Sequence, residues 1–223
     1  MRVLIVFAHP VPGTYPFAVL SAFSQALEEG GATPTLLDLY EDGFDPRFTA
    51  EDHGHFWGGP IPGDVDRYHK LVEEADRLAF VFPVYWWGMP AMMKGWIERV
   101  FTGNWAYVYG EGVEDRGKAG LKGLLGNKPT ILLGIGGSTE RTYTRYRYDE
   151  AMRTAIDVGI FSYCGIRDVT SHYLFDVEGD TNAERRAEYL DEVRVLGGTF
   201  AEADRVPHDA KGAHFARDSG DQS

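Results

Sequence analysis

The chain has 223 residues, of which 43% are hydrophobic and 25% charged, so it is long enough for one sizeable core and has an ordinary globular composition. Lys and Arg number 22 against 34 Asp and Glu, and the resulting net charge of −12 disfavours binding to nucleic acids or anionic membrane surfaces. The single cysteine, Cys164, excludes an intrachain disulfide and a zinc site built from thiolates.

The N-terminal apolar run, Val3–Ala8, is too short for a signal peptide, and no small-residue cleavage site follows it. The longest charge-free stretch, residues 78–93, is shorter than the roughly 20 residues of a spanning helix and contains prolines. The lone cysteine also fits a reducing compartment. We therefore expect a cytoplasmic protein with no integral membrane segment.

Hydrophobic runs and turn signals predict strands that alternate with helices along the chain. The predicted strands cover residues 3–8, 34–40, 78–84, 130–135 and 168–175. The predicted helices cover residues 16–29, 65–75, 90–101, 148–163 and 181–203, the last opened by a capping box at Thr181 and Glu184. The alternation predicts an α/β doubly wound, five-stranded parallel sheet with helices on both faces, in one domain over residues 1–204, followed by a polar tail over 205–223.

Two stretches show no regular pattern. Residues 41–63 form a long aromatic and glycine-rich loop in this interpretation, and loops of that length are usually functional. Residues 104–127 are glycine-rich and predicted to be irregular. His53 and His55 could be a metal pair, but a surface loop is the simpler interpretation, so we predict no metal site.

Three loops at predicted strand ends carry the candidate chemistry, because ligands of open α/β sheets bind at the carboxyl ends of the strands. The first, residues 9–16, lies before a helix N-terminus and contains His9 and Thr14. Its unpaired N–H groups would suit a phosphate. The alternative is that Thr14 is only a helix cap and His9 only a buried hydrogen-bonding residue.

The second loop, residues 83–89, contains Tyr85, Trp86 and Trp87, and three consecutive large aromatics cannot all face one core. Such an exposed patch often binds a flat ligand, and ordinary packing or an oligomer interface is the alternative. The third loop, residues 134–143, has two glycines, at 136 and 137, that allow close backbone approach, or that form a plain turn. Together the loops suit a cofactor with a phosphate and a flat, polar-edged ring, such as a flavin.

Three segments carry a family resemblance: AHPVPGTYPFAVL (residues 8–20), FPVYWWGMPAMMKGWIERVFTGNWAY (82–107) and GIGGSTERTY (134–143). They resemble the flavodoxin-like NAD(P)H:quinone oxidoreductases, a group that includes DT-diaphorase, modulator of drug activity B and potassium-efflux ancillary proteins. The resemblance covers about residues 1–200 and is most specific in the middle segment. It implies a flavodoxin-like fold, bound FAD or sometimes FMN, NAD(P)H as co-substrate, and a homodimer.

The resemblance also implies site residues. His9, Thr14 and Tyr15 would meet the pyrophosphate, and Pro83, Val84, Tyr85, Trp86 and Trp87 would line the isoalloxazine ring. Gly136 and Gly137 would contact the pyrimidine edge of the ring, near Tyr143. The family's Tyr and His pair, which offsets charge on the reduced flavin, has no clean match. Tyr143 is the candidate for the Tyr, and Tyr146 or Arg145 for the His.

These features predict hydride transfer from NAD(P)H through the bound flavin to a quinone or similar flat acceptor, in a two-electron, ping-pong reaction. An azo- or nitroreductase is the alternative within the same class. A flavin-bound regulatory subunit of a membrane transport system is the alternative from a different class, and a one-electron flavodoxin carrier is a third. Trp96, Phe101 and Trp105 carry more aromatic surface than one small domain readily covers, which predicts that the dimer buries the 90–101 helix region and part of residues 104–109.

Overall fold

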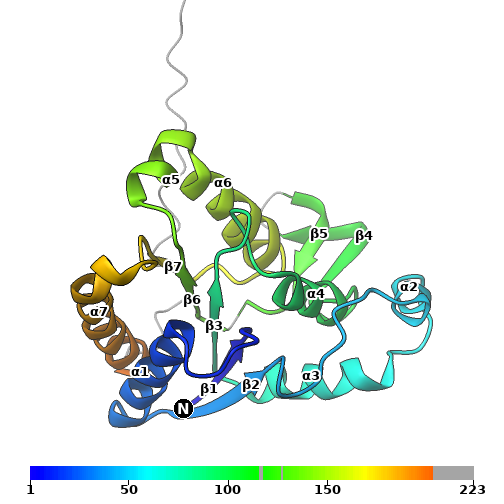
Figure 1. Ribbon diagram of the computed structural model, residues 1–223. Coiled ribbons are helices and arrows are strands. Elements are labelled where there is room, and N and C mark those ends of the chain that lie inside the picture. The colour runs from blue at the N-terminus through cyan, green and yellow to red at the C-terminus, as the bar shows by residue number, and fades with distance from the viewer. Residues whose placement is uncertain (116–117, 127, 203–223) are drawn as a thin grey trace, which may run out of the picture.

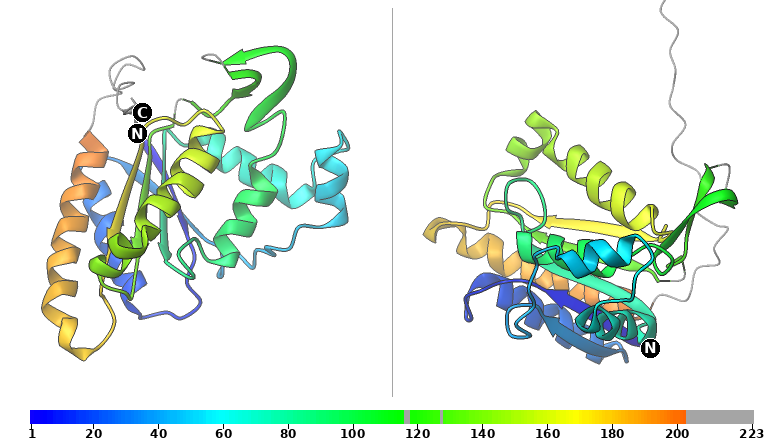
Figure 2. Two further views of the ribbon diagram at one scale, coloured as in Figure 1. Left: turned by 90° about the horizontal axis from the view of Figure 1, so that it is seen from above. Right: turned by 90° about the vertical axis from the view of Figure 1, so that its right-hand side faces the viewer.

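In the computed structural model, which describes residues 1–115, 118–126 and 128–202, the chain forms a parallel sheet between two helical layers (Figures 1 and 2). The sheet strands are β1 (Arg2–Phe7), β2 (Thr33–Asp38), β3 (Arg77–Pro83), β6 (Thr130–Ile135) and β7 (Val169–Leu174), in the order β2-β1-β3-β6-β7. All four pairings are parallel. The predicted fold class and the five predicted strands are confirmed.

Two helical layers cover the sheet because residues on the inner strands alternate between two apolar faces (Figure 2). On one face, Val3 and Ile5 pack with α1 (Tyr15–Glu29) and α7 (Ala183–Glu202). On the other, Leu4 and Val6 share a core with residues of further helices. These are α3 (Gly63–Glu74), α4 (Ala91–Val100), α5 (Glu140–Tyr146), α6 (Tyr148–Met152) and the π-helix η1 (Arg153–Ser162).

Several irregular stretches of the sequence turn out to be ordered elements. Residues 41–63 contain α2 (Ala50–Phe56), and the predicted 104–127 irregular segment contains an antiparallel hairpin of β4 (Tyr107–Asp115) and β5 (Lys118–Gly123). The third loop continues into α5 (Glu140–Tyr146), and a 3-10 turn, η2 (Asp180–Asn182), precedes α7. The last helix therefore begins at Ala183, after the predicted capping position. The predicted tail lies outside the described residues.

The segment that carries α2 is anchored by Arg99, a buried side chain of α4 that is only 4% exposed. Its guanidinium donates to Asp52 at 2.9 Å, to Asp64 at 2.7 and 3.0 Å, and to the carbonyl of Asp45 at 3.0 Å. Asp52 also accepts hydrogen bonds from the backbone and hydroxyl of Thr49, which completes a capping box at the start of α2. The segment from Asp45 to Asp64 is thus held by a buried cation.

The aromatic side chains of α4 do not form an outer surface. Trp96 is fully buried and Phe101 is nearly so, in the core beneath the sheet. The Trp105 ring stacks on His69 at 3.8 Å between ring centroids, and its Nε1 donates to Glu73. Trp96 and Phe101 therefore need no second subunit to cover them, contrary to the prediction, whereas Trp105 is only partly buried.

Cys164 lies after η1, at the base of the same core, and its side chain is buried. Burial raises the pKa of its thiol to about 12.

Among the described residues no helix is long and apolar enough to cross a membrane.

Candidate functional site

The strand order places the candidate loops at one edge of the sheet. Connections run in opposite directions from β1 and β3, so the carboxyl ends of these two strands flank the point where the strand order reverses. The loop after β6 lies beside them because β6 pairs with β3. The three predicted loops therefore meet at the edge where open α/β sheets bind ligands (Figure 1).

The first loop is folded around Thr14. The Thr14 hydroxyl donates to the carbonyl of Val11 at 2.8 Å and lies 3.1 Å from Nδ1 of His9. It makes no capping hydrogen bond to α1, although Thr14 holds the N-cap position. The cap alternative for its side chain is therefore wrong, and the hydroxyl orders the loop instead.

Tyr15 contributes differently from the prediction. Its hydroxyl donates to the carbonyl of Arg186 in α7 at 2.9 Å, which turns the side chain toward α7. Burial raises the pKa of Tyr15 to about 12. The loop still offers donors to an anion. In the described structure, the N–H groups of His9, Gly13 and Tyr15 have no hydrogen-bond partner, and they precede or begin α1. The His9 side chain uses only its Nδ1 in hydrogen bonds within the loop.

The second loop is a tight hairpin turn. Tyr85 and Gly88 exchange reciprocal backbone hydrogen bonds of 3.1 Å. The two central residues, Trp86 and Trp87, have φ values of 49° and 59°, as a type I′ turn requires. Left-handed conformations cost a non-glycine residue about 1–2 kcal/mol each. Such strain persists at functional sites, where the surrounding structure fixes it.

The turn presents its two tryptophans in opposite ways. Trp86 is 94% exposed. The Trp87 ring stacks on Tyr148 at 3.8 Å with an interplanar angle of 11°, and meets Tyr143 edge-on at 5.2 Å. Pro83 is buried in β3, and the N–H of Val84 donates to Ile135, so both belong to the sheet edge that supports the turn. The unpaired N–H groups of the turn are those of the two tryptophans.

Replacing Trp86 with glycine is expected to leave the free energy of unfolding unchanged or to raise it by up to about 1 kcal/mol. Relief of the left-handed backbone outweighs the extra chain entropy of glycine, and no packing is lost. Trp87→Gly is the matched control, because its φ is similar but its ring stacks on Tyr148; it should lose about 1–3 kcal/mol. Urea denaturation checks both. Equal destabilisation of the two variants would contradict this account of the turn.

In the third loop the two glycines have different roles. The N–H of Gly136 donates to the carbonyl of Leu174 at 2.8 Å, so it is not free for a ligand, contrary to the prediction. A Cβ at Gly136 would lie 2.6 Å from the Tyr143 hydroxyl, which explains why only glycine fits there. The N–H of Gly137 has no partner in the described chain and faces the same edge of the sheet.

Tyr143 and Tyr146 both lie on α5 but in different surroundings. Tyr143 is buried against Trp87 and Phe175, and its phenol lies beside Gly136. Burial, and secondarily the charge of Glu178, raises the pKa of Tyr143, so the phenol keeps its proton and can donate it in a hydrogen bond. Tyr146 is 57% exposed, with Arg145 over its ring at 5.5 Å.

Two residues of the site were not predicted from the sequence. Tyr148 forms the stacking support for Trp87. Glu178, in the loop after β7, lies against Gly137, where an added Cβ would be 2.4 Å from the carboxyl group. No local motif marks either residue, since both reach the site from elements that lie beside it only in the fold.

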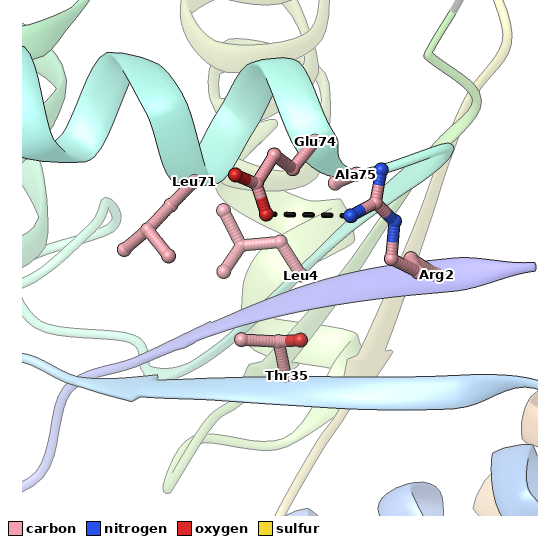
Figure 3. Close-up of a pocket in the computed structure, with 6 residues that line it drawn as sticks. All are labelled: Arg2, Leu4, Thr35, Leu71, Glu74 and Ala75. Carbon is pink, nitrogen blue, oxygen red and sulfur yellow. Dashed lines mark hydrogen bonds and ion pairs between the residues drawn. The ribbon is translucent and has the colours of Figure 1, made fainter.

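Other candidate sites are weaker. Nδ1 of His55 lies 3.0 Å from the carbonyl of Gly59, and Nε2 of His53 accepts from Trp57. Within the described ranges no group of three or more potential metal ligands gathers. A cavity of about 20 Å³ lies near the N-terminal ends of β1 and β2, where Arg2 pairs with Glu74 at 3.3 Å (Figure 3). That volume admits about one water molecule, and the cavity is far from the strand ends that form the site.

Comparison with known proteins gives consistent matches. A family model described as "Flavodoxin-like fold" matches residues 1–196. An uncharacterized NAD(P)H oxidoreductase of Haemophilus influenzae is 31% identical over 190 residues, 84% of this chain and 90% of that protein. NAD(P)H dehydrogenase [quinone] 1 of Cavia porcellus is 30% identical, covering 85% and 73%. The structure of NAD(P)H:quinone oxidoreductase from Methanothermobacter marburgensis has a TM-score of 0.81 at 29% identity, covering 92% and 98%.

Proposed function

Because this chain belongs to the flavodoxin-like fold family, we infer that it is a flavin-dependent oxidoreductase that takes hydride from NAD(P)H and reduces a quinone or a similar flat acceptor. The family match over residues 1–196 gives the fold, and the similarity to NAD(P)H oxidoreductases supports the class of reaction. The residues that would do the work are argued below from the geometry of the three loops.

The site offers a flavin several backbone N–H groups that have no hydrogen-bond partner within the described chain. In the described structure, the N–H groups of Trp86, Trp87 and Gly137 lack hydrogen-bond partners and lie at the carboxyl ends of β3 and β6. Trp86 is exposed and the other two residues are partly exposed, so these N–H groups are open to water or to a ligand. A flavin ring has carbonyl and nitrogen acceptors along one edge, so the convergence of these donors is the observation that carries the proposal.

The bound flavin would supply the chemistry, accepting hydride from NAD(P)H and passing two electrons to the acceptor. The protein residues bind and orient it. The N–H groups of the first loop and the dipole of α1 would hold its phosphate groups. The protonated phenol of Tyr143, beside Gly136, would donate a hydrogen bond to the edge of the ring where negative charge develops on reduction. The stacked rings of Trp87 and Tyr148 would exclude water from one side of the space that the flavin and its substrates occupy, here called the flavin slot.

We propose that the resident flavin is FAD rather than FMN, because the family resemblance of residues 8–20 places a pyrophosphate at the first loop. Purification without added cofactor is expected to give a yellow protein with about one flavin per chain. Chromatography of the flavin released by denaturation should identify FAD. A colourless protein that takes up neither FAD nor FMN on reconstitution would overturn the proposed function, and release of FMN alone would overturn only the choice of flavin.

We also propose a homodimer. Several aromatic side chains remain exposed, among them Trp86 on the turn after β3, Tyr109 on the β4–β5 hairpin and Trp57 after α2. Exposed aromatic groups of this size are typical of protein interfaces. A second subunit seated there would cover the open side of the flavin slot.

A further inference from the structure

The loop after β7 holds Glu178 at the candidate site through its backbone. The N–H of Asp176 donates to Ser138 at 3.0 Å, and that of Val177 donates to Gly136 at 3.3 Å, which ties this loop to the loop after β6. The side chain of Asn182 donates to the carbonyl of Glu178 at 2.6 Å. The position of Glu178 beside the third loop is therefore set by main-chain contacts on both sides of it.

The carboxylate of Glu178 lies among three groups of the site. It lies against Gly137: a Cβ added to Gly137 would be 2.4 Å from the carboxyl group. Its charge also helps to raise the pKa of two nearby phenols. For Tyr143, burial is the larger cause and Glu178 the second. For Tyr85, burial and then Tyr40 contribute more than Glu178 does. Among the described residues Glu178 forms no ion pair: the Arg186 guanidinium beside it donates instead to the carbonyls of Val177 and Gly179, and Asp176 pairs with Arg185.

An unpaired negative charge at this place has a consequence for the ring that Gly137 would contact. Hydride from NAD(P)H delivers two electrons and one proton, so one net negative charge is added at the ring until a second proton arrives from solvent. That charge gathers along the edge that Gly137 and Tyr143 would face. A like charge nearby disfavours it by Coulomb repulsion, and the repulsion is weakened but not removed by solvent around an exposed carboxylate.

We propose that Glu178 lowers the midpoint potential of the bound flavin by placing an uncompensated carboxylate beside Gly137. The proposal rests on the flavin site of the proposed function. A lower potential makes the reduced enzyme a stronger donor to the quinone, and the Tyr143 phenol opposes the carboxylate by stabilising the same charge. The midpoint potential of the flavin would then reflect the balance of these two opposing side chains.

The test is the midpoint potential of the flavin-loaded protein, measured by dye-equilibrated reduction and followed by absorbance. Glu178→Gln is expected to favour the reduced form about tenfold, which for a two-electron couple is a rise of about 30 mV. The affinity for oxidised flavin should change less than about twofold, because the oxidised ring carries no charge. Raising the salt concentration should shrink the difference between wild type and variant.

Two variants separate this electrostatic role from a structural one. Glu178→Asp keeps the charge and should keep the potential close to that of the wild type. Glu28→Gln removes an equal charge from the exposed end of α1, at the opposite edge of the sheet, and should leave the potential unchanged. A potential unmoved by Glu178→Gln, or moved equally by Glu28→Gln, would overturn the proposal. Failure to bind any flavin would instead count against the proposed function.

Discussion

Replacing Arg99 with methionine is expected to lower the free energy of unfolding by about 3–5 kcal/mol at neutral pH. Methionine fills much of the same volume, so the loss reports the charge and its hydrogen bonds rather than a large cavity. The variant leaves the buried carboxylate of Asp52 without its counter-ion, and Asp64 and the carbonyl of Asp45 without their donor. Urea denaturation at neutral pH measures the loss.

The same cluster predicts how the loss depends on pH. Burial disfavours ionisation of Asp52, but hydrogen bonds from Arg99 and Thr49 outweigh it, and the net pKa of Asp52 is lowered. A lowered pKa stabilises the fold above the carboxyl's unfolded pKa of about 3.9, and this stabilisation is lost as the pH falls through the folded value. The difference between wild type and Arg99→Met should therefore be largest at neutral pH and shrink in acid.

Arg47→Met is the matched control for this prediction. Arg47 also pairs with an aspartate, Asp45, at 2.6 Å, but its side chain is exposed. Exposed ion pairs contribute at most about 1 kcal/mol, so this variant should be nearly as stable as the wild type. If Arg99→Met were no more destabilising than Arg47→Met, the buried cluster would not be what holds the α2 segment in place.

Replacing Tyr143 with phenylalanine is expected to slow reduction of the flavin by NAD(P)H tenfold to a hundredfold while leaving flavin content near normal. The phenol is a preorganised donor where charge develops, and removing one such donor can cost about 2.7–4 kcal/mol. The expected loss is smaller because Gly137 still offers its N–H, but that of Gly136 is already bonded to Leu174 and cannot compensate. Rapid-mixing kinetics of flavin reduction measure the effect.

Tyr146→Phe is the paired control, since Tyr146 lies on the same helix but is largely exposed. It should change the rate less than about twofold. If Tyr146→Phe slows flavin reduction while Tyr143→Phe does not, the phenol that stabilises the charge is that of Tyr146. No change in either variant would leave charge stabilisation to the backbone donors.

The sheet could be predicted from the sequence because its three inner strands are apolar, buried runs and helices lie between the strands. The α2 helix could not, because its sequence, AEDHGHF, has no apolar stripe and is held by an arginine more than 40 residues away. The β4–β5 hairpin was missed for a related reason. Its strands are rich in glycine and charge, and it forms a separate two-stranded sheet rather than part of the buried one.

For the site, the sequence identified the three loops but not how each group within them is used. The hydroxyl of Tyr15 is taken by Arg186, a residue 171 positions later, and the N–H of Gly136 by Leu174. Both partners lie on α7 or β7, which come next to these loops only in the folded structure. Glu178 reaches the site in the same way, so a residue that bears on the electrostatics of the third loop has no signature within that loop.

Quinones are electrophiles as well as electron acceptors, and they add to free thiolates to form stable thioethers. The one cysteine of this chain is sealed in the core, and with a thiol pKa near 12 almost none of it is thiolate at neutral pH. An enzyme that admits such molecules to an open slot therefore exposes no sulfur nucleophile to them. Arylation at sulfur would therefore have to wait for unfolding, when Cys164 becomes accessible.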